Sequence, residues 1–112
     1  MACLFCKIAA GEIPCTKVYE DELFLAFRDI QPKAKSHILL IPKKHIPTLN
    51  DLAEEDTELA GKWLQTAKKI AELEGLKENG YRTVINCNQD AGQEVFHIHI
   101  HILGGEKLST IN

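Results

Sequence analysis

The sequence predicts one α+β domain over residues 1–112, with a five-stranded antiparallel sheet, one long helix and one short helix. Three observations lead to this prediction. The 112 residues are 45% hydrophobic and 26% charged, which suits a single compact core. Residues 51–76 have helical periodicity, and five strand-like segments lie on both sides of them. No repeat, low-complexity tract or linker-like stretch divides the chain.

The first helix is expected at residues 3–10, where Gly11 ends it and Pro14 prevents it from resuming. Strand-like runs at residues 18–19 and 23–27 then flank a short acidic segment. Together these two runs predict a β-hairpin.

A central strand is expected at residues 37–41, because this run is continuously apolar after His37 and stops at Pro42. Such a run is typical of a strand that is covered on both faces.

The long helix is expected over residues 51–76, because apolar residues recur every three to four positions. They are Leu52, Leu59, Trp63, Ala67, Ile70 and Leu73. Asp51 followed by Glu54 resembles a capping box, and Gly75 is a natural stop. Trp63 is a candidate both for a homodimer interface and for the core.

The last two strands are expected at residues 81–86 and 95–103, separated by a polar turn. In the second of them His97, His99 and His101 alternate with isoleucines, so a strand places the imidazoles on one face and the isoleucines in the core. Three interpretations of the histidine face compete: a solvated polar face, a catalytic metal site, and metal-free nucleophilic catalysis by a neutral imidazole. The preceding Gly92 favours the third, because backbone amides at a glycine turn can cradle a phosphate, although an ordinary turn also uses glycine.

The net charge is −3 and no basic run exceeds two residues, which excludes a general nucleic-acid-binding surface. No apolar window reaches the length of a membrane span and no targeting segment precedes the domain, so we expect a cytoplasmic protein with no membrane partner. In a reducing compartment the four cysteines are expected to be free or to bind metal. Cys3 and Cys6 have the spacing of half a zinc site, and a redox motif is a weaker interpretation.

The segment His97-Ile98-His99-Ile100-His101-Ile102-Leu103 fits the histidine-triad signature. Further likeness is found at residues 5–8, 11–14, 26–30, 37–46, 86 and 92–105. The chain therefore resembles the Hint branch of the histidine-triad (HIT) superfamily over nearly its whole length, which implies a HIT-like fold.

The resemblance implies that a purine nucleoside monophosphate lies across the histidine strand and that His99 attacks its phosphorus. It implies that His101 contacts the phosphate or the leaving group, and that His37 and His97 complete the network. The implied nucleotide-binding residues are Leu4, Phe5, Ile8, Ile13, Phe27, Asp29, Ile30, Asn86, Gly92, Gln93, Glu94 and Val95. Among these, Asp29 binds the ribose hydroxyls, and the amides near residues 92–94 meet the oxyanion charge.

The expected reaction is hydrolysis of a purine nucleoside phosphoramidate, carrying AMP or GMP, through a nucleotidyl-histidine and without a metal in the chemistry. Hydrolysis of dinucleoside polyphosphates or aminoacyl adenylates is one alternative, and a nucleotide-binding adaptor with vestigial activity is another. The resemblance also implies a homodimer, paired through the long helix and a strand edge. It implies a structural zinc held by Cys3, Cys6, His45 and His97, in which case His97 supports His99 and carries no proton.

Two departures from the family pattern leave the leaving group open. Glu94 stands where animal members have a serine whose hydroxyl assists the leaving group, whereas bacterial members often have glutamate. The residues after Gly104-Gly105 lack the Trp- or Pro-containing tail that reaches the partner's site in the family.

Overall fold

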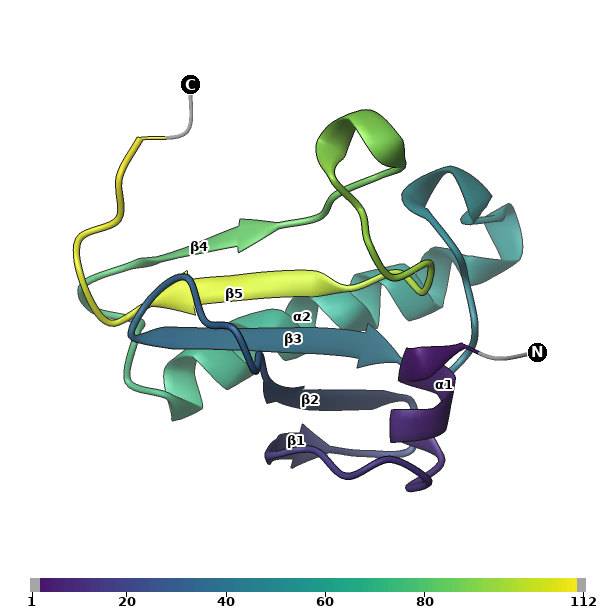
Figure 1. The fold of residues 1–112 in the computed structure, drawn as a ribbon, viewed down its shortest axis with the longest axis horizontal. Coiled ribbons are helices and arrows are strands. Elements are labelled where there is room, and N and C mark those ends of the chain that lie inside the picture. Colours follow the sequence, from purple (N-terminus) through teal and green to yellow (C-terminus); the bar gives the residue numbers. More distant parts are fainter. Residues whose placement is uncertain (1–2, 111–112) are drawn as a thin grey trace.

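The computed structural model describes residues 3–110 and confirms the α+β prediction. Its helices and strands are α1 (Leu4–Ala9), β1 (Lys17–Glu20), β2 (Phe24–Arg28), β3 (Ser36–Pro42), α2 (Thr57–Leu73), β4 (Tyr81–Val84) and β5 (Ile100–Gly104). The strands form one five-stranded antiparallel sheet in the order β1-β2-β3-β5-β4. The helix α2 covers one face of this sheet, and α1 lies at the other (Figure 1).

Strand β3 is buried on both faces, as its continuous apolar run predicted. Ile38 and Leu40 point to the α2 side and pack in the larger core cluster. Leu39 and Ile41 point to the opposite side and pack with Phe5 of α1. Two layers of apolar contact therefore hold the strand that carries His37.

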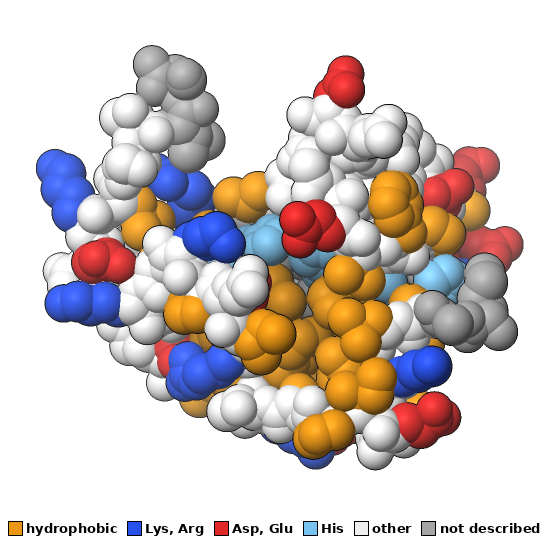
Figure 2. Space-filling model, viewed as in Figure 1, with side chains coloured by type: hydrophobic (Ala, Val, Ile, Leu, Met, Phe, Trp, Pro, Cys, Tyr) orange, Lys and Arg blue, Asp and Glu red, His pale blue; other side chains and the backbone are white. Residues whose placement is uncertain are grey.

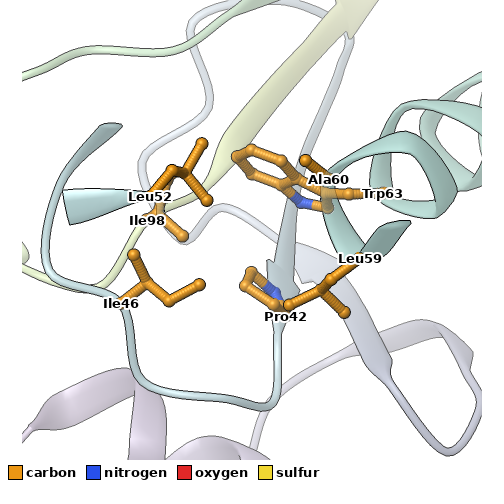
Figure 3. Close-up of a pocket in the computed structure, with 7 residues that line it drawn as sticks. All are labelled: Pro42, Ile46, Leu52, Leu59, Ala60, Trp63 and Ile98. Carbon is orange, nitrogen blue, oxygen red and sulfur yellow. The ribbon is translucent and has the colours of Figure 1, made fainter. Parts of the chain in front are cut away.

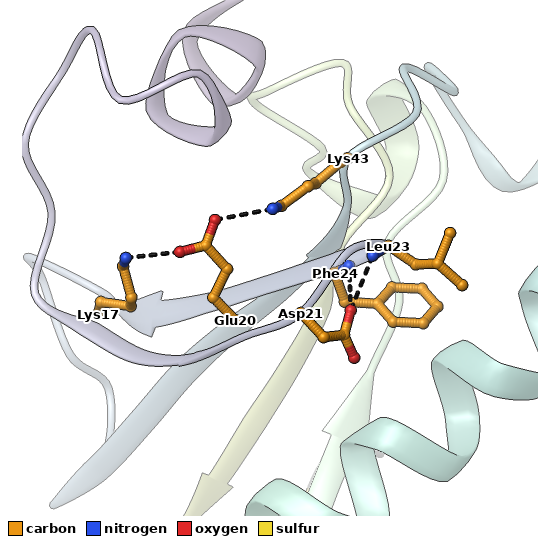
Figure 4. A network of polar contacts seen from close by, with 6 residues as sticks. All are labelled: Lys17, Glu20, Asp21, Leu23, Phe24 and Lys43. Atoms are coloured by element: carbon orange, nitrogen blue, oxygen red, sulfur yellow. Dashed lines mark hydrogen bonds and ion pairs between the residues drawn. The ribbon is translucent and has the colours of Figure 1, made fainter.

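The predicted hairpin is present as β1 and β2, and a polar network stabilises its turn (Figure 4). The carboxylate of Asp21 accepts the backbone N–H groups of Leu23 and Phe24 at 2.8 Å each. Glu20 accepts from Lys17 at 2.5 Å and from Lys43 at 2.7 Å. These two hydrogen bonds lower the pKa of the Glu20 carboxyl to about 2.

The long helix begins at Thr57, so the predicted start at Asp51 is wrong. The Asp51 carboxylate accepts the backbone N–H of Thr48 at 3.1 Å and its hydroxyl at 2.8 Å, and thereby closes a separate 3₁₀ turn at Leu49–Asp51. Its capping partner is therefore upstream and is not Glu54. The stop at Gly75 is confirmed, since this residue has φ +75° directly after the helix.

Trp63 belongs to the core, so its proposed role as an interface anchor is wrong. Its side chain is 3% exposed, and its indole Nε1–H donates to the Leu40 carbonyl at 3.1 Å. Beside it lies a small apolar cavity of about 10 Å³, no larger than a water molecule needs (Figure 3). This gap lies between α2 and the core and has no room for a ligand.

The last strand is shorter than predicted, because regular pairing begins only at Ile100. Before it, the Ile98 amide donates to the Ile46 carbonyl at 2.7 Å, which draws this segment away from the sheet ladder. The alternation nevertheless persists, since Ile98, Ile100 and Ile102 are all buried in the α2-side core. The histidines between them are therefore directed away from that core.

Within residues 3–110, no helix has both the length and the apolar character that crossing a bilayer requires.

Replacing Trp63 with phenylalanine should lower the free energy of unfolding by about 1–2 kcal/mol, because the buried Leu40 carbonyl loses its indole donor. Leu49 lies outside α2 and is 42% exposed, so Leu49→Ala should change the stability by less than about 0.5 kcal/mol. Urea denaturation of both variants measures the difference. Equal losses would contradict the core assignment.

Candidate active site

An open cleft of about 890 Å³ lies on the sheet face opposite α2. Its floor comes from β2, β3, β5 and β4, and its walls come from α1, the 86–95 segment and residues 106–109. Figure 2 shows histidine side chains at the bottom of the hollow, beside exposed hydrophobic ones. The volume is within the range of small-molecule sites.

The cleft brings together most of the residues that the sequence singled out. Those that line it are Leu4, Phe5, Ile8, Phe27, Asp29, Ile30, His37, Asn86, Gly92, Gln93, Glu94, Val95, His99 and His101. Two predicted residues are not part of its lining. Ile13 is half-buried in the turn after α1, and His97 is fully buried beneath the cleft.

Sequence reasoning missed a group of further lining residues. Leu39, Leu103, Val84 and Arg82 share the histidine face of the sheet, and a period of two along each strand could have found them. The segment at residues 106–109 also lines the cleft, but no pattern in the sequence indicated it.

The ring of His99 is oriented by a single hydrogen bond from its Nδ1 to the His97 carbonyl at 2.7 Å. A carbonyl can only accept, so the proton is on Nδ1 and the Nε2 lone pair of the neutral ring is free. Phe5 packs against this ring at a centroid distance of 5.1 Å. Burial lowers the pKa of His99 below its ordinary value, which favours the neutral form.

A second chain of hydrogen bonds, here called the histidine relay, determines the tautomers of His37 and His101. The backbone N–H of Lys33 donates to His37 Nδ1 at 3.0 Å, so the His37 proton is on Nε2. That Nε2–H donates to His101 Nδ1 at 2.9 Å and lies 3.4 Å from Asp29 Oδ2. His101 must then carry its own proton on Nε2.

Both histidines of the relay are neutral near pH 7. Burial, together with the neighbouring His99 and His37, lowers the pKa of His101 to about 4. Burial also lowers the pKa of His37, against the opposing charge of Asp29. The site thus combines an unprotonated nitrogen on His99 with an N–H on His101, and the two rings are 5.0 Å apart.

Comparison with known proteins agrees with this geometry. The family model of the HIT domain matches residues 10–108. The chain belongs to the HIT family. It is 51% identical to the purine nucleoside phosphoramidase of Escherichia coli K12 over 108 residues, which cover 96% of this chain and 91% of that protein.

Solved structures of HIT proteins share the fold. A HIT family hydrolase from Legionella pneumophila Philadelphia 1 has a TM-score of 0.94 and 58% identity, covering 96% of both chains. A histidine triad nucleotide-binding protein from Candida albicans has a TM-score of 0.83 and 32% identity, covering 99% of this chain and 86% of that one. The predicted resemblance to the HIT superfamily is therefore confirmed.

The polar residues of this HIT cleft include Asp29, His37 and His101, whose ligand atoms lie within 4.8 Å of one another. The relay excludes them as a metal site. His37 Nδ1 already accepts the Lys33 N–H, so its Nε2 carries a proton and has no lone pair to offer a cation.

A second group of potential ligands lies outside the cleft lining and consists of Cys3, Cys6, His45 and His97, here called the Cys/His cluster. His97 Nδ1 lies 3.4 Å from Cys3 Sγ, 3.5 Å from Cys6 Sγ and 3.3 Å from His45 Nδ1. Atoms bound tetrahedrally to one zinc ion are about 3.3–3.8 Å apart, given the usual zinc–ligand lengths. The His97 Nε2–H donates to the Pro42 carbonyl at 2.7 Å, which leaves Nδ1 unprotonated toward the cluster. These four residues fit a zinc ion.

The loop before the histidines differs from the expected phosphate cradle. The amides of Gly92 and Gln93 already donate within the loop, to Gln89 at 2.9 Å and Asn88 at 3.1 Å. The expectation that these two amides bind the phosphate is therefore wrong, and only the amide of Glu94 remains from that set. The turn needs its own hydrogen bonds because Asn88 and Gly92 both have positive φ.

The Gln93 side chain holds this loop in place. Its Oε1 accepts the Asn88 N–H at 2.8 Å, and its Nε2 donates to the carbonyls of Pro47 at 2.8 Å and Val95 at 3.0 Å. Because the side-chain oxygen and nitrogen of Gln93 are both bonded to this part of the chain, the residue holds the wall of the cleft in its shape.

The free energy of unfolding should fall as the pH is lowered from about 6.5 to about 4. Histidines of the unfolded chain bind a proton near pH 6.5, whereas burial keeps His101 neutral until about pH 4, so acid favours the unfolded state. Urea denaturation across this range measures the slope, and His101→Gln should reduce it. A slope that the variant leaves unchanged would contradict the low pKa of His101.

Proposed function

We propose that this chain hydrolyses purine nucleoside phosphoramidates to a nucleoside monophosphate and an amine, through a nucleotidyl intermediate on His99. One observation carries the proposal: His99 presents an unprotonated Nε2 at the floor of the cleft, because its Nδ1–H is held by the His97 carbonyl. The purine nucleoside phosphoramidase of Escherichia coli, 51% identical, supports this substrate class.

In the first step, the lone pair of His99 Nε2 attacks phosphorus and the bond from phosphorus to the amine nitrogen breaks. The departing amine must receive a proton. A bound phosphate raises the pKa of the adjacent His101 from about 4, so that this ring carries the proton and donates it. In the second step, water attacks phosphorus, the bond to His99 breaks, and His101 takes the proton of the water.

The nucleoside is proposed to lie along the wall that begins at α1. Leu4, Phe5, Ile8 and Phe27 provide an apolar surface for the purine. The Asp29 carboxylate, which also accepts the Gln31 amide at 2.8 Å, is the acceptor for the ribose hydroxyls. The phosphate then lies over His99 and His101, near the Glu94 amide and Asn86.

The carboxylate of Glu94 distinguishes between leaving groups. It lines the cleft on the side of the phosphate site. A negative charge there disfavours the anionic leaving group of a dinucleoside polyphosphate and favours an amine, which leaves with an extra proton. A purely nucleotide-binding adaptor remains as an outcome of the assay below.

The Cys/His cluster is proposed to hold a structural zinc ion, supported by its tetrahedral spacing. Zinc there supplies no chemistry to the reaction, because His97 lies outside the lining of the cleft. It joins α1, the segment after β3 and the segment before β5.

The active form is proposed to be a homodimer. Strand β4 is an edge of the sheet, and its unpaired backbone groups can pair with a second copy. Leu64 and Leu73 of α2 and Tyr81 of β4 also expose apolar side chains. These elements are the long helix and strand edge that the resemblance implied.

Adenosine phosphoramidate should be converted to AMP and ammonia, and His99→Ala should lower kcat at least ~10³-fold because the nucleophile is removed. Release of AMP by the wild-type protein and the variant measures this. Leu49→Ala, at an exposed side chain outside the cleft lining, is the matched control and should keep full activity. Binding without turnover by the wild type would favour the adaptor, and an active His99→Ala would remove His99 from the mechanism.

Purified protein should contain about one zinc ion per chain, because the four cluster residues complete one tetrahedral site. Elemental analysis measures the content, and Cys3→Ser should lower it. Zinc well below this level, unaffected by Cys3→Ser, would contradict the site. Cys87→Ser, which changes a cysteine outside the cluster, should retain the metal.

A further inference from the structure

His97 links the Cys/His cluster to the nucleophile through one residue. Its ring nitrogen Nδ1 belongs to the cluster, while its backbone carbonyl accepts the His99 Nδ1–H at 2.7 Å. The ring and the carbonyl belong to one residue, so the cluster and the group that determines the orientation and tautomer of His99 share the backbone of His97.

The cluster is also joined to the purine wall of the cleft. Cys3 and Cys6 flank Phe5 in α1, and the Cys6 amide donates to Cys3 Sγ at 3.3 Å. The ring of Phe5 packs edge-on against His99 at 5.1 Å and against Phe27 at 5.4 Å. The residue that borders the purine surface thus lies between the two cysteines of the cluster in the sequence.

We propose that a thiophilic divalent cation at the Cys/His cluster sets the positions of His99 and Phe5, so that metal occupancy controls nucleotide binding and turnover. Cys3, Cys6 and His45 are then positioning residues for the reaction. This inference rests on the proposed function and on the proposed zinc ion.

The cluster lies where three segments of the chain meet, as this role requires. Helix α1 has only six residues and pairs with no strand, so it is too short to be stable alone. The cluster joins it to His45, which follows β3, and to His97, which precedes β5. The sulfur–nitrogen contacts within the cluster are 3.3–3.5 Å long. A bound cation replaces these weak contacts with four strong bonds.

The test compares the full-length protein after removal of metal by a chelator with the same sample after addition of Zn²⁺. The metal-free form should bind AMP about tenfold more weakly, because Phe5 is no longer held, and its kcat should fall about 10–100-fold, because His99 is misoriented. Both values should recover with Zn²⁺. Residual turnover should still exceed that of His99→Ala.

A spectroscopic measurement keeps the test independent of activity. In ¹⁵N-edited NMR spectra, the His99 Nδ1–H bonded to a carbonyl should give a slowly exchanging signal in the zinc-loaded protein. This signal should broaden or disappear in the metal-free protein, while amide signals of β3 and α2 persist. A merely structural metal would lower the thermal stability and leave the His99 signal unchanged.

His45→Ala provides a second variant, because this half-buried side chain lies outside the cleft lining and its loss is easily tolerated. It should weaken zinc affinity and reproduce the metal-free kinetics, whereas Cys87→Ser should behave as wild type. Folded metal-free protein with unchanged AMP affinity, kcat and His99 signal would overturn the inference. Failure to bind zinc would overturn both this inference and the zinc proposal. A zinc-loaded protein without turnover would overturn the proposed function alone, because AMP affinity and the NMR signal still report on the coupling between the cluster and His99.

Discussion

The hydrogen bond from His99 Nδ1–H to the His97 carbonyl is the interaction on which the rest of the site depends. It orients the ring and determines which nitrogen is free. Burial lowers the pKa of His99 because it disfavours the charged form of the ring, and this effect outweighs the hydrogen bond and the charge of Asp29, which both raise the pKa. The Nε2 lone pair of His99 is therefore available near neutral pH.

Backbone groups assign the tautomers of the other histidines as well. The Pro42 carbonyl holds the His97 proton on Nε2, and the Lys33 amide holds the His37 proton on Nε2. As a result His97 offers Nδ1 to the Cys/His cluster, and His37 donates to His101. Identical side chains thus acquire different chemical roles from fixed backbone donors and acceptors, which the strands and their adjoining loops keep in place.

Much of the fold could be predicted, because apolar periodicity reports which faces are buried. The run ending at Pro42 predicted a strand covered twice, and the alternation of histidine and isoleucine predicted the two faces of the last segment, although regular pairing starts only at Ile100. The start of α2 could not be predicted, because Asp51 satisfied a local capping pattern with Thr48. Trp63 was ambiguous because its partner, the Leu40 carbonyl, is 23 residues away.

The sequence by itself determined the fold class, the family and the list of chemically active residues, because these follow from residue types and their spacing. Only the tertiary structure decided what each residue does. It placed His97 under the cleft, engaged the amides of Gly92 and Gln93 within their own loop, and assigned a proton to each ring of the site. The physical reason is that tautomers and free donors depend on partners distant in the chain, and no spacing along the sequence specifies them.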